Sequence, residues 1–485
     1  MKKHILIALL LAAGSTAVAQ NKFKAVENNL GGWVKIRDSI GWNIRDRMAN
    51  YHINAVSIAV IDHYKIAWAK AYGWADTAKK IPATTNTLFQ AASVGKSIHA
   101  TAMMKLAQDG KINLDSDINT YLKSWRFPYD TVSHGKKITV REILSHTAGL
   151  SVHGYDGYLP GQHLPSILQI INGEPPANSP AVRSIAEPGK KFEYSGGGYE
   201  ISELITEDIT GKPYTAFMRS TIFKPMQMNR TFYQTELTRI KDQRLATAYR
   251  YDGKSIGCDY HIYPENACGA GLWTTPTDLA KFIIQLQLSI NNKSNKILAA
   301  SSTQQLFNPQ VEKTNALGFF VEQKGEQTYF HHDGVNEGFV SDYFASLKNG
   351  QGVVIMANTD LATYIDITEE ITNSVATVYG WNGFYTPVVK TEVKVPDSLA
   401  NAYCGKYRFN ENSDQTVTIF KKNDKLWFHD SSSPVPWLMH FSNYKDFFFY
   451  EIVFNMHSFT MNKSGKIDGF MIKAPDGSFK VKRIE

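Results

Sequence analysis

Cysteine, runs of basic residues and long apolar segments are all scarce in this sequence. Three cysteines in 485 residues exclude a small fold held together by disulfides, and their spacing fits no zinc site. The odd count leaves at least one free thiol in a monomer, and we expect buried thiols in preference to a bridge between Cys258 and Cys268. No run of five or more basic residues occurs, and the net charge of +7 is mild for this length. Nucleic-acid binding is therefore disfavoured.

The most apolar stretch lies at the N-terminus. Two lysines precede Ile5–Ala13, and Ala17-Val18-Ala19 has the small-x-small form of a signal-peptidase site. This pattern predicts a signal peptide at residues 1–19, a cut after Ala19, and a periplasmic or secreted mature protein. No later run reaches the roughly 18 apolar residues that a membrane span requires, so we expect no span.

The rest of the composition, 43% apolar and 20% charged, is typical of a globular protein of two or three domains. Two hairpins are indicated. Ala55–Ile61 and Lys65–Tyr72 form the first, while Val340–Leu347 and Gly352–Ala357 flank an Asn-Gly turn in the second. A helix is predicted over Leu361–Tyr379, so sheet signals bracket a middle that is rich in helices and loops.

Helical periodicity marks three further segments. Apolar residues recur at helical spacing over Trp33–Tyr51, Ser93–Gln108 and Gly197–Ile209, and glycine follows the last two segments closely, as at many helix ends. The stretch from Pro160 to Pro188 is rich in proline, and we expect no regular structure there. Loops of this kind often border binding sites.

The residue pattern of the sequence changes after about Trp381. A proline-containing linker leads into short, aromatic, alternating segments such as Thr416–Phe420 and Lys425–Phe428. We therefore predict a main domain over residues 20–385 and a separate small β-rich domain over residues 396–485.

Ser93 and Lys96 form the first chemically suggestive motif. They are three residues apart at the predicted start of a helix, so both side chains share one face. A serine hydroxyl becomes a nucleophile when a neighbour takes its proton and a positive field stabilises the alkoxide, and a lysine at a helix N-terminus supplies both conditions. An arbitrary Ser-x-x-Lys is more often a helix cap beside a solvated lysine, so this motif alone proves little.

Three further motifs follow in order, and together with Ser93-x-x-Lys96 they resemble the serine hydrolases of the class C β-lactamase superfamily. That superfamily also includes D-Ala-D-Ala carboxypeptidases, D-aminopeptidases and esterases. The motifs are Leu144-Ser145-His146-Thr147-Ala148-Gly149, Phe192-Glu193-Tyr194-Ser195-Gly196-Gly197-Gly198-Tyr199 and His331-His332-Asp333-Gly334-Val335. The resemblance covers about Val26–Tyr379, and Gly405-Lys406-Tyr407 resembles a small β domain that many bacterial members append.

The resemblance implies a role for each matching residue. Ser93 would be the acylated nucleophile, Lys96 its proton-handling neighbour and Tyr194 a general acid or base. A phenol is normally protonated at neutral pH, so Tyr194 needs a nearby cation to act as a base, and Lys96 would be that cation. Lys96 could equally take the proton itself, and the sequence leaves this choice open.

The motif His332-Asp333-Gly334 stands where the family has Lys-Thr-Gly or His-x-Gly. Gly334 would let substrate lie close to the strand, and the backbone N–H of Val335 would join that of Ser93 in holding the oxyanion. We expect His332 to line the pocket. Strand alternation turns His331 to the opposite face, which argues against a two-histidine metal site. His146 is expected to play a structural, hydrogen-bonding role.

Two departures concern substrate choice. Gly196 stands where class C β-lactamases have the asparagine of Tyr-x-Asn, and His332 stands where they have lysine. Groups that would bind the acylamino and carboxylate parts of a β-lactam are thereby lost, since neutral histidine is a weak anion anchor. These changes weigh against β-lactams but leave the acylation residues intact.

The sequence therefore predicts an α+β protein of β-lactamase/transpeptidase-like fold, in which an antiparallel sheet with flanking helices adjoins a helical lobe, followed by a small C-terminal β domain. We expect an exported serine hydrolase that acts on ester or amide bonds through an acyl-enzyme, without metal or organic cofactor, on a small-molecule or peptide substrate. The alternatives are a true class C-like β-lactamase and a non-catalytic protein that binds penicillin or peptidoglycan fragments.

Overall fold

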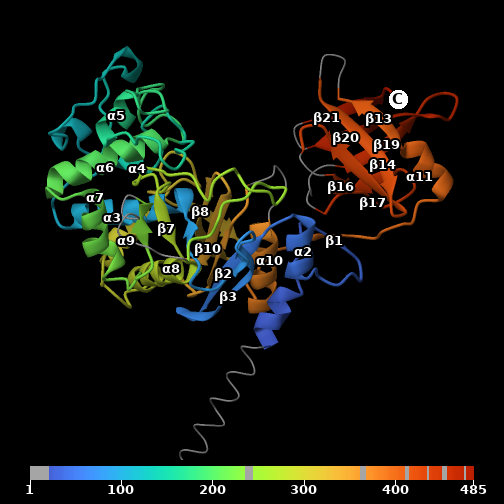
Figure 1. The fold of residues 1–485 in the computed structure, drawn as a ribbon, viewed down its shortest axis with the longest axis horizontal. Coiled ribbons are helices and arrows are strands. Elements are labelled where there is room, and N and C mark those ends of the chain that lie inside the picture. The colour runs from blue at the N-terminus through green and yellow to red at the C-terminus, as the bar shows by residue number, and fades with distance from the viewer. Residues whose placement is uncertain are drawn as a thin grey trace, which may run out of the picture. The chain divides into compact units, whose positions relative to one another are not determined.

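The computed structural model describes residues 21–234, 244–360, 367–409, 414–433, 436–450, 456–474 and 477–485 (Figure 1). The predicted signal peptide lies outside these residues. The chain divides into two compact units. The first is Met48–Leu361, and the second combines Gln20–Arg47 with Ala362–Glu485. The boundary predicted between residues 385 and 396 remains a prediction.

The first unit is built on a seven-stranded antiparallel sheet of order β4-β3-β2-β11-β10-β9-β8. Its strands are β2 (Ala55–Asp62), β3 (Lys65–Asp76), β4 (Ile81–Pro82), β8 (Phe320–Lys324), β9 (Gln327–Asn336), β10 (Phe339–Ser346) and β11 (Gly352–Ala357). Both predicted hairpins are confirmed, as β2–β3 and β10–β11. Strand β11 is buried at every residue, which explains why its sequence is continuously apolar instead of alternating.

Helices cover this sheet and form a lobe beside it. Helix α8 contacts β2, β3 and β11, while α4 and α5 both contact α6 in the helical lobe (Figure 1). The helices are α3 (Gly95–Gln108), α4 (Val140–Leu144), α5 (Ile167–Asn172), α6 (Gly196–Thr210), α7 (Tyr214–Met218), α8 (Pro276–Ile290) and α9 (Ala300–Leu306). Short turns are η1 (Ala92–Val94), η2 (Ile118–Thr120), η3 (Thr131–Ser133) and η4 (Arg219–Phe223), and a small sheet joins β5 (Phe89–Gln90), β7 (Leu272–Thr274) and β6 (Phe232–Tyr233). The α+β fold is confirmed.

Two secondary-structure predictions were wrong in part. The helix expected over Trp33–Tyr51 is replaced in its first half by β1 (Val34–Ile36), and α2 (Ile44–Asn50) begins only after Asp38 has taken a left-handed backbone, which ends any helix. The proline-rich stretch contains α5. No proline falls within that helix, and Ser166 begins it with a reciprocal capping box.

The second unit contains a nine-stranded antiparallel sheet of order β16-β15-β14-β13-β21-β20-β19-β18-β17. Its strands are β13 (Gly405–Arg408), β14 (Thr416–Lys422), β15 (Lys425–Asp430), β16 (Trp437–Leu438), β17 (His440–Phe441), β18 (Asp446–Phe448), β19 (Met456–Met461), β20 (Ile467–Ala474) and β21 (Gly477–Arg483). Tyr403, Tyr407, Phe428 and Phe470 lie in its aromatic core. A β-rich C-terminal domain is thus confirmed, although it also holds an unpredicted helix, α11 (Asp397–Tyr403).

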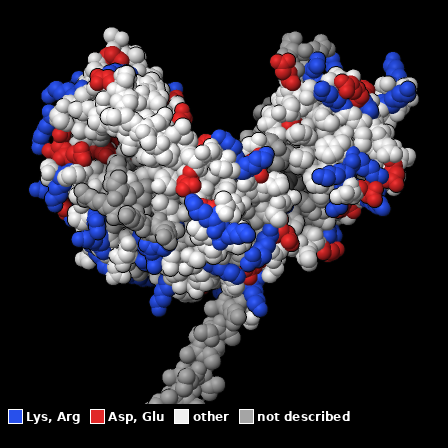
Figure 2. Space-filling model, in the orientation of Figure 1, with Lys and Arg blue, Asp and Glu red and all other residues white. Residues whose placement is uncertain are grey.

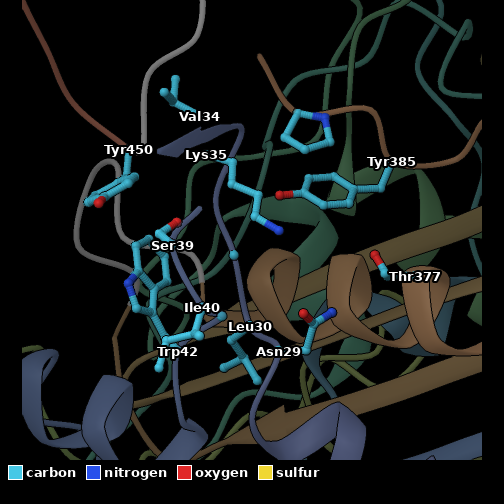
Figure 3. A pocket seen from close by; sticks show the side chains of 13 residues that line it. Asn29, Leu30, Val34, Lys35, Ser39, Ile40, Trp42, Thr377, Tyr385 and Tyr450 are labelled. Atoms are coloured by element: carbon cyan, nitrogen blue, oxygen red, sulfur yellow. The ribbon is translucent and has the colours of Figure 1, made fainter. Parts of the chain in front are cut away.

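The N-terminal segment completes this second unit. Strand β1 pairs in parallel with β12 (Val388–Lys390), and the hydroxyl of Ser374 in α10 (Ile367–Tyr379) donates to Val26 O at 2.8 Å. The first part of the predicted helix over Leu361–Tyr379 lies outside the described residues. A cavity of about 210 Å³ lies within the unit, with Lys35 extending toward Tyr385 (Figure 3).

The visible surface carries side chains of both charge signs, and the three cysteines form no disulfide. Basic and acidic side chains are interspersed over the visible face (Figure 2). Cys258, Cys268 and Cys404 are free thiols, so the bridge between Cys258 and Cys268 is absent as expected, but only Cys268 is buried and the other two are half-buried. Within the described ranges, no helix combines the length and the apolar character that crossing a bilayer demands.

Candidate active site

Ser93 lies in η1, between strand β5 and helix α3. The preceding residue, Ala92, has a φ of +49°, a left-handed conformation that is uncommon for a residue with a Cβ atom. Such strain persists where surrounding contacts enforce it, and it concentrates at functional sites. The turn leaves Ser93 partly exposed, while its neighbours Ala92 and Val94 are buried.

Lys96 lies one helical turn further on and is 2% exposed. Its Nζ donates to Ser93 Oγ at 3.0 Å and to the Cys268 carbonyl oxygen at 2.8 Å. Burial disfavours the charge, but Tyr194, Cys268 and Glu200 outweigh it and raise the pKa of Lys96 above its usual value. The side chain is therefore an ammonium at neutral pH, in contact with the hydroxyl oxygen.

Tyr194 precedes Ser195, whose hydroxyl caps the N-terminus of α6. Its ring stacks on that of His146, with centroids 4.1 Å apart, and the Lys96 Nζ lies 4.9 Å from its centroid. His146 Nδ1 accepts the Ser195 N–H at 3.1 Å. Burial, with help from Lys96 and His332, lowers the pKa of His146 well below its usual value. A neutral His146 thus supports the tyrosine ring, as its expected structural role requires.

Strand β9 contributes the remaining residues of the predicted site. Strand β8 pairs with β9 only as far as His331, so among the described strands residues 332–336 pair with β10 alone. His332 is 2% exposed, and its Nδ1 donates to Asp333 O at 2.6 Å. Burial lowers its pKa to about 4 despite the opposing effect of Asp333. His332 is therefore neutral near pH 7, with its ring centroid 6.5 Å from that of Tyr194.

The side chain of His331 does not join that of His332 at the site. Its ring stacks on Phe344 of β10, with centroids 4.4 Å apart, and strand alternation separates it from His332. The two histidines therefore do not converge on one point.

Gly334 brings β9 against the nucleophile segment. A Cβ atom on this residue would lie 2.3 Å from Ala91 O and 2.9 Å from Ser93 N, so only glycine fits without movement. The neighbouring Val335 exposes 45% of its surface. The structure thus brings Ser93, Lys96, Tyr194 and the β9 segment of the predicted site together.

The space beside Gly196 is narrower than the motif suggests. A Cβ atom here would lie 3.1 Å from His153 O and 3.3 Å from Tyr155 Cε2. A larger residue at position 196 would therefore require the loop that carries His153 and Tyr155 to move by a few tenths of an ångström.

Sequence reasoning missed the groups that hold these residues in place. The Cys268 carbonyl anchors Lys96, and the Asn336 side-chain amide donates to Gln90 Oε1 at 2.7 Å and to Ala270 O at 2.8 Å. Every residue has a backbone carbonyl group, so the sequence does not mark the one that accepts this hydrogen bond. The glycines that follow Cys268, Gly269 and Gly271, were the available signal.

Comparisons with known proteins agree with this geometry. A family model described as Beta-lactamase matches residues 43–369, and one described as a domain of unknown function (DUF3471) matches residues 389–485. Protein flp of Staphylococcus aureus (strain N315) is 25% identical over 319 residues, which are 63% of this chain and 60% of that protein. The match thus spans about three fifths of that relative. The putative penicillin-binding protein PbpX of Bacillus subtilis (strain 168) is 27% identical over 303 residues, 61% of this chain and 68% of that protein.

Solved structures show the same fold at lower identity. The octameric penicillin-binding protein homologue from Pyrococcus abyssi superposes with a TM-score of 0.59 at 17% identity, covering 90% of this chain and 98% of that one. The D-amino acid amidase from Ochrobactrum anthropi SV3, in complex with D-phenylalanine, gives a TM-score of 0.58 at 22% identity, covering 74% and 99%.

Proposed function

Since the chain belongs to the β-lactamase family of serine hydrolases, we propose that it is an exported hydrolase that cleaves ester or amide bonds through an acyl-enzyme on Ser93. The observation that carries this proposal is the 3.0 Å contact between the buried Lys96 ammonium and the Ser93 hydroxyl oxygen. The N-terminal signal pattern supports export.

In the first step, Ser93 Oγ forms a bond to the substrate carbonyl carbon, whose oxygen takes up the negative charge, and the serine proton passes to the Tyr194 oxygen. Lys96 is held as a cation, so it favours the phenolate and the alkoxide electrostatically and leaves Tyr194 as the proton acceptor. The backbone N–H groups of Ser93 and Val335 would receive the oxyanion.

In the second step, Tyr194 returns this proton to the leaving alcohol or amine as its bond to carbon breaks. The resulting ester on Ser93 is then attacked by water. Tyr194 accepts the proton of the water and finally restores it to Ser93, so the cycle consumes one water and needs no other reactant.

We propose small esters or D-amino-acid peptides as substrates in preference to β-lactams. Neutral His332 provides no fixed positive charge for a lactam carboxylate, and Gly196 provides no side-chain amide for the acylamino group. The D-amino acid amidase among the structural neighbours is consistent with this choice.

Labelling with a fluorophosphonate probe tests the nucleophile. Wild-type protein should be labelled on the peptide that contains Ser93, and Ser93→Ala should lose the label while it keeps its melting temperature. Ser301→Ala, which changes an exposed serine of α9, is the control and should label normally. An unlabelled wild type with an intact fold would instead indicate the non-catalytic alternative.

A further inference from the structure

Two glutamates of α6 hold consecutive backbone amides of the loop at residues 265–269. Glu200 Oε1 accepts the Cys268 N–H at 3.0 Å, and Glu203 Oε2 accepts the Ala267 N–H at 2.8 Å. Glu203 Oε1 also accepts the side-chain amide of Asn266 at 3.1 Å. The glutamates lie about one helical turn apart and are 0% and 5% exposed, so they form a buried clamp on the loop.

This loop touches the nucleophile segment directly. Its Cys268 carbonyl is the acceptor for the Lys96 ammonium at 2.8 Å. The next residue, Gly269, has a φ of +90°, and a Cβ atom there would lie 2.3 Å from Ala92 O and 2.7 Å from Gly95 Cα. The backbone of the loop therefore lies directly against the segment that carries Ser93.

The acyl-transfer steps leave these carboxyl groups without a direct role. Burial, together with Glu265, raises the pKa of Glu200, and burial together with Glu200 raises that of Glu203. Burying two carboxyl groups is unfavourable unless they form hydrogen bonds that the fold needs. Among the described residues, the hydrogen bonds that the two carboxyl groups accept all come from the loop that contacts Lys96, while Glu200 Oε2 is buried without a partner.

We propose that Glu200 and Glu203 are positioning residues that fix the Cys268 carbonyl and so hold the Lys96 ammonium beside Ser93. Because α6 begins two residues after Tyr194, the same helix positions both Tyr194 and the acceptor of Lys96. The inference rests on the proposed hydrolase function, since it concerns the same site.

The test compares Glu200→Ala with Glu200→Gln in the full chain. We expect Glu200→Ala to lower the rate of fluorophosphonate labelling about 10²-fold, because a displacement of roughly 1 Å costs that much. Glu200→Gln retains an oxygen that can accept the Cys268 N–H, so it should restore most of the rate. With p-nitrophenyl acetate, Glu200→Ala should lower kcat and leave KM unchanged, since Glu200 does not touch substrate.

Glu207→Ala is the matched control. Glu207 lies on the same helix and also accepts one backbone N–H, from Tyr214 at 2.8 Å, but it does not hold the loop. The Glu207→Ala variant should keep the wild-type labelling rate, even if its melting temperature changes. If Glu200→Ala does not fold, Glu203→Ala takes its place, because Glu203 holds the adjacent amide.

The outcomes separate the two proposals. Wild-type protein that does not label would refute the proposed function. Wild-type protein that labels, together with a Glu200→Ala variant that labels equally fast, would overturn the positioning role alone. A Glu200→Gln variant as slow as Glu200→Ala would also overturn it, because the acceptor oxygen would then not be what matters.

Discussion

Replacing Gly334 by alanine should push β9 away from the segment that carries Ser93. The added Cβ atom would lie 2.3 Å from Ala91 O and 2.7 Å from Ser341 Oγ. The first distance is about 1 Å below the roughly 3.5 Å at which non-bonded heavy atoms attract best. The obstructing atom is backbone, so relief requires the strand or the turn to move, and the space beside Ser93 N changes with it.

We expect Gly334→Ala to lower the labelling rate of Ser93 about 10²-fold, as a displacement of roughly 1 Å does elsewhere. The unfolding free energy should fall by about 1 to 3 kcal/mol through overpacking. Fluorophosphonate labelling and urea unfolding measure the two effects. Gly154→Ala is the control, because a Cβ atom there meets nothing within 4 Å. A Gly334→Ala protein with wild-type labelling would show that the close approach of β9 is not needed for acylation.

Three other predictions concern catalysis, pH and substrate. Tyr194→Phe should reduce kcat by about 10² to 10⁴, the usual value of general acid–base assistance, and an unchanged kcat on p-nitrophenyl acetate would remove Tyr194 from the mechanism. Burial lowers the pKa of His332 to about 4 and that of His99 to about 3, against about 6.5 in an unfolded chain. The unfolded chain therefore binds more protons between about pH 4 and 6.5, so the unfolding free energy should fall as the pH drops through this window and should not depend on these groups above it. Urea titrations at several pH values check this, and a profile without such a fall would contradict the burial of neutral histidines. Finally, p-nitrophenyl acetate should exceed nitrocefin in kcat/KM, because two lost polar contacts cost about 1 to 3 kcal/mol each, and a strong preference for nitrocefin would refute the interpretation of Gly196 and His332.

The sequence was most informative where spacing alone encodes the geometry. Ser93 and Lys96 are three residues apart at a helix start, so their contact follows from helical periodicity. Tyr194 and His332 are distant in sequence, and only the resemblance to a family linked them to Ser93.

The supporting contacts could not be predicted in the same way. A backbone carbonyl such as that of Cys268 is present at every position, so the sequence cannot distinguish the one that meets Lys96. Glu200 and Glu203 follow a helical pattern that surface residues also show. Over Trp33–Tyr51, the helix predicted from apolar spacing was wrong in its first half, because Val34–Ile36 pairs with a strand that lies far away in the sequence.

That pairing has a consequence for the order of folding. Val34 of β1 lies opposite Val388 of β12, and the whole first unit, Met48–Leu361, is synthesised between them. At about 5 to 20 residues per second, the intervening chain takes roughly 20 to 70 s to make. We expect the first unit to fold during this interval, before β12 has been synthesised and can pair with β1. The closing of this long loop would then be a late, slow event. It should be observable as protection from hydrogen exchange of the Arg37 amide, which donates to Lys390 O at 2.8 Å, after that of β2.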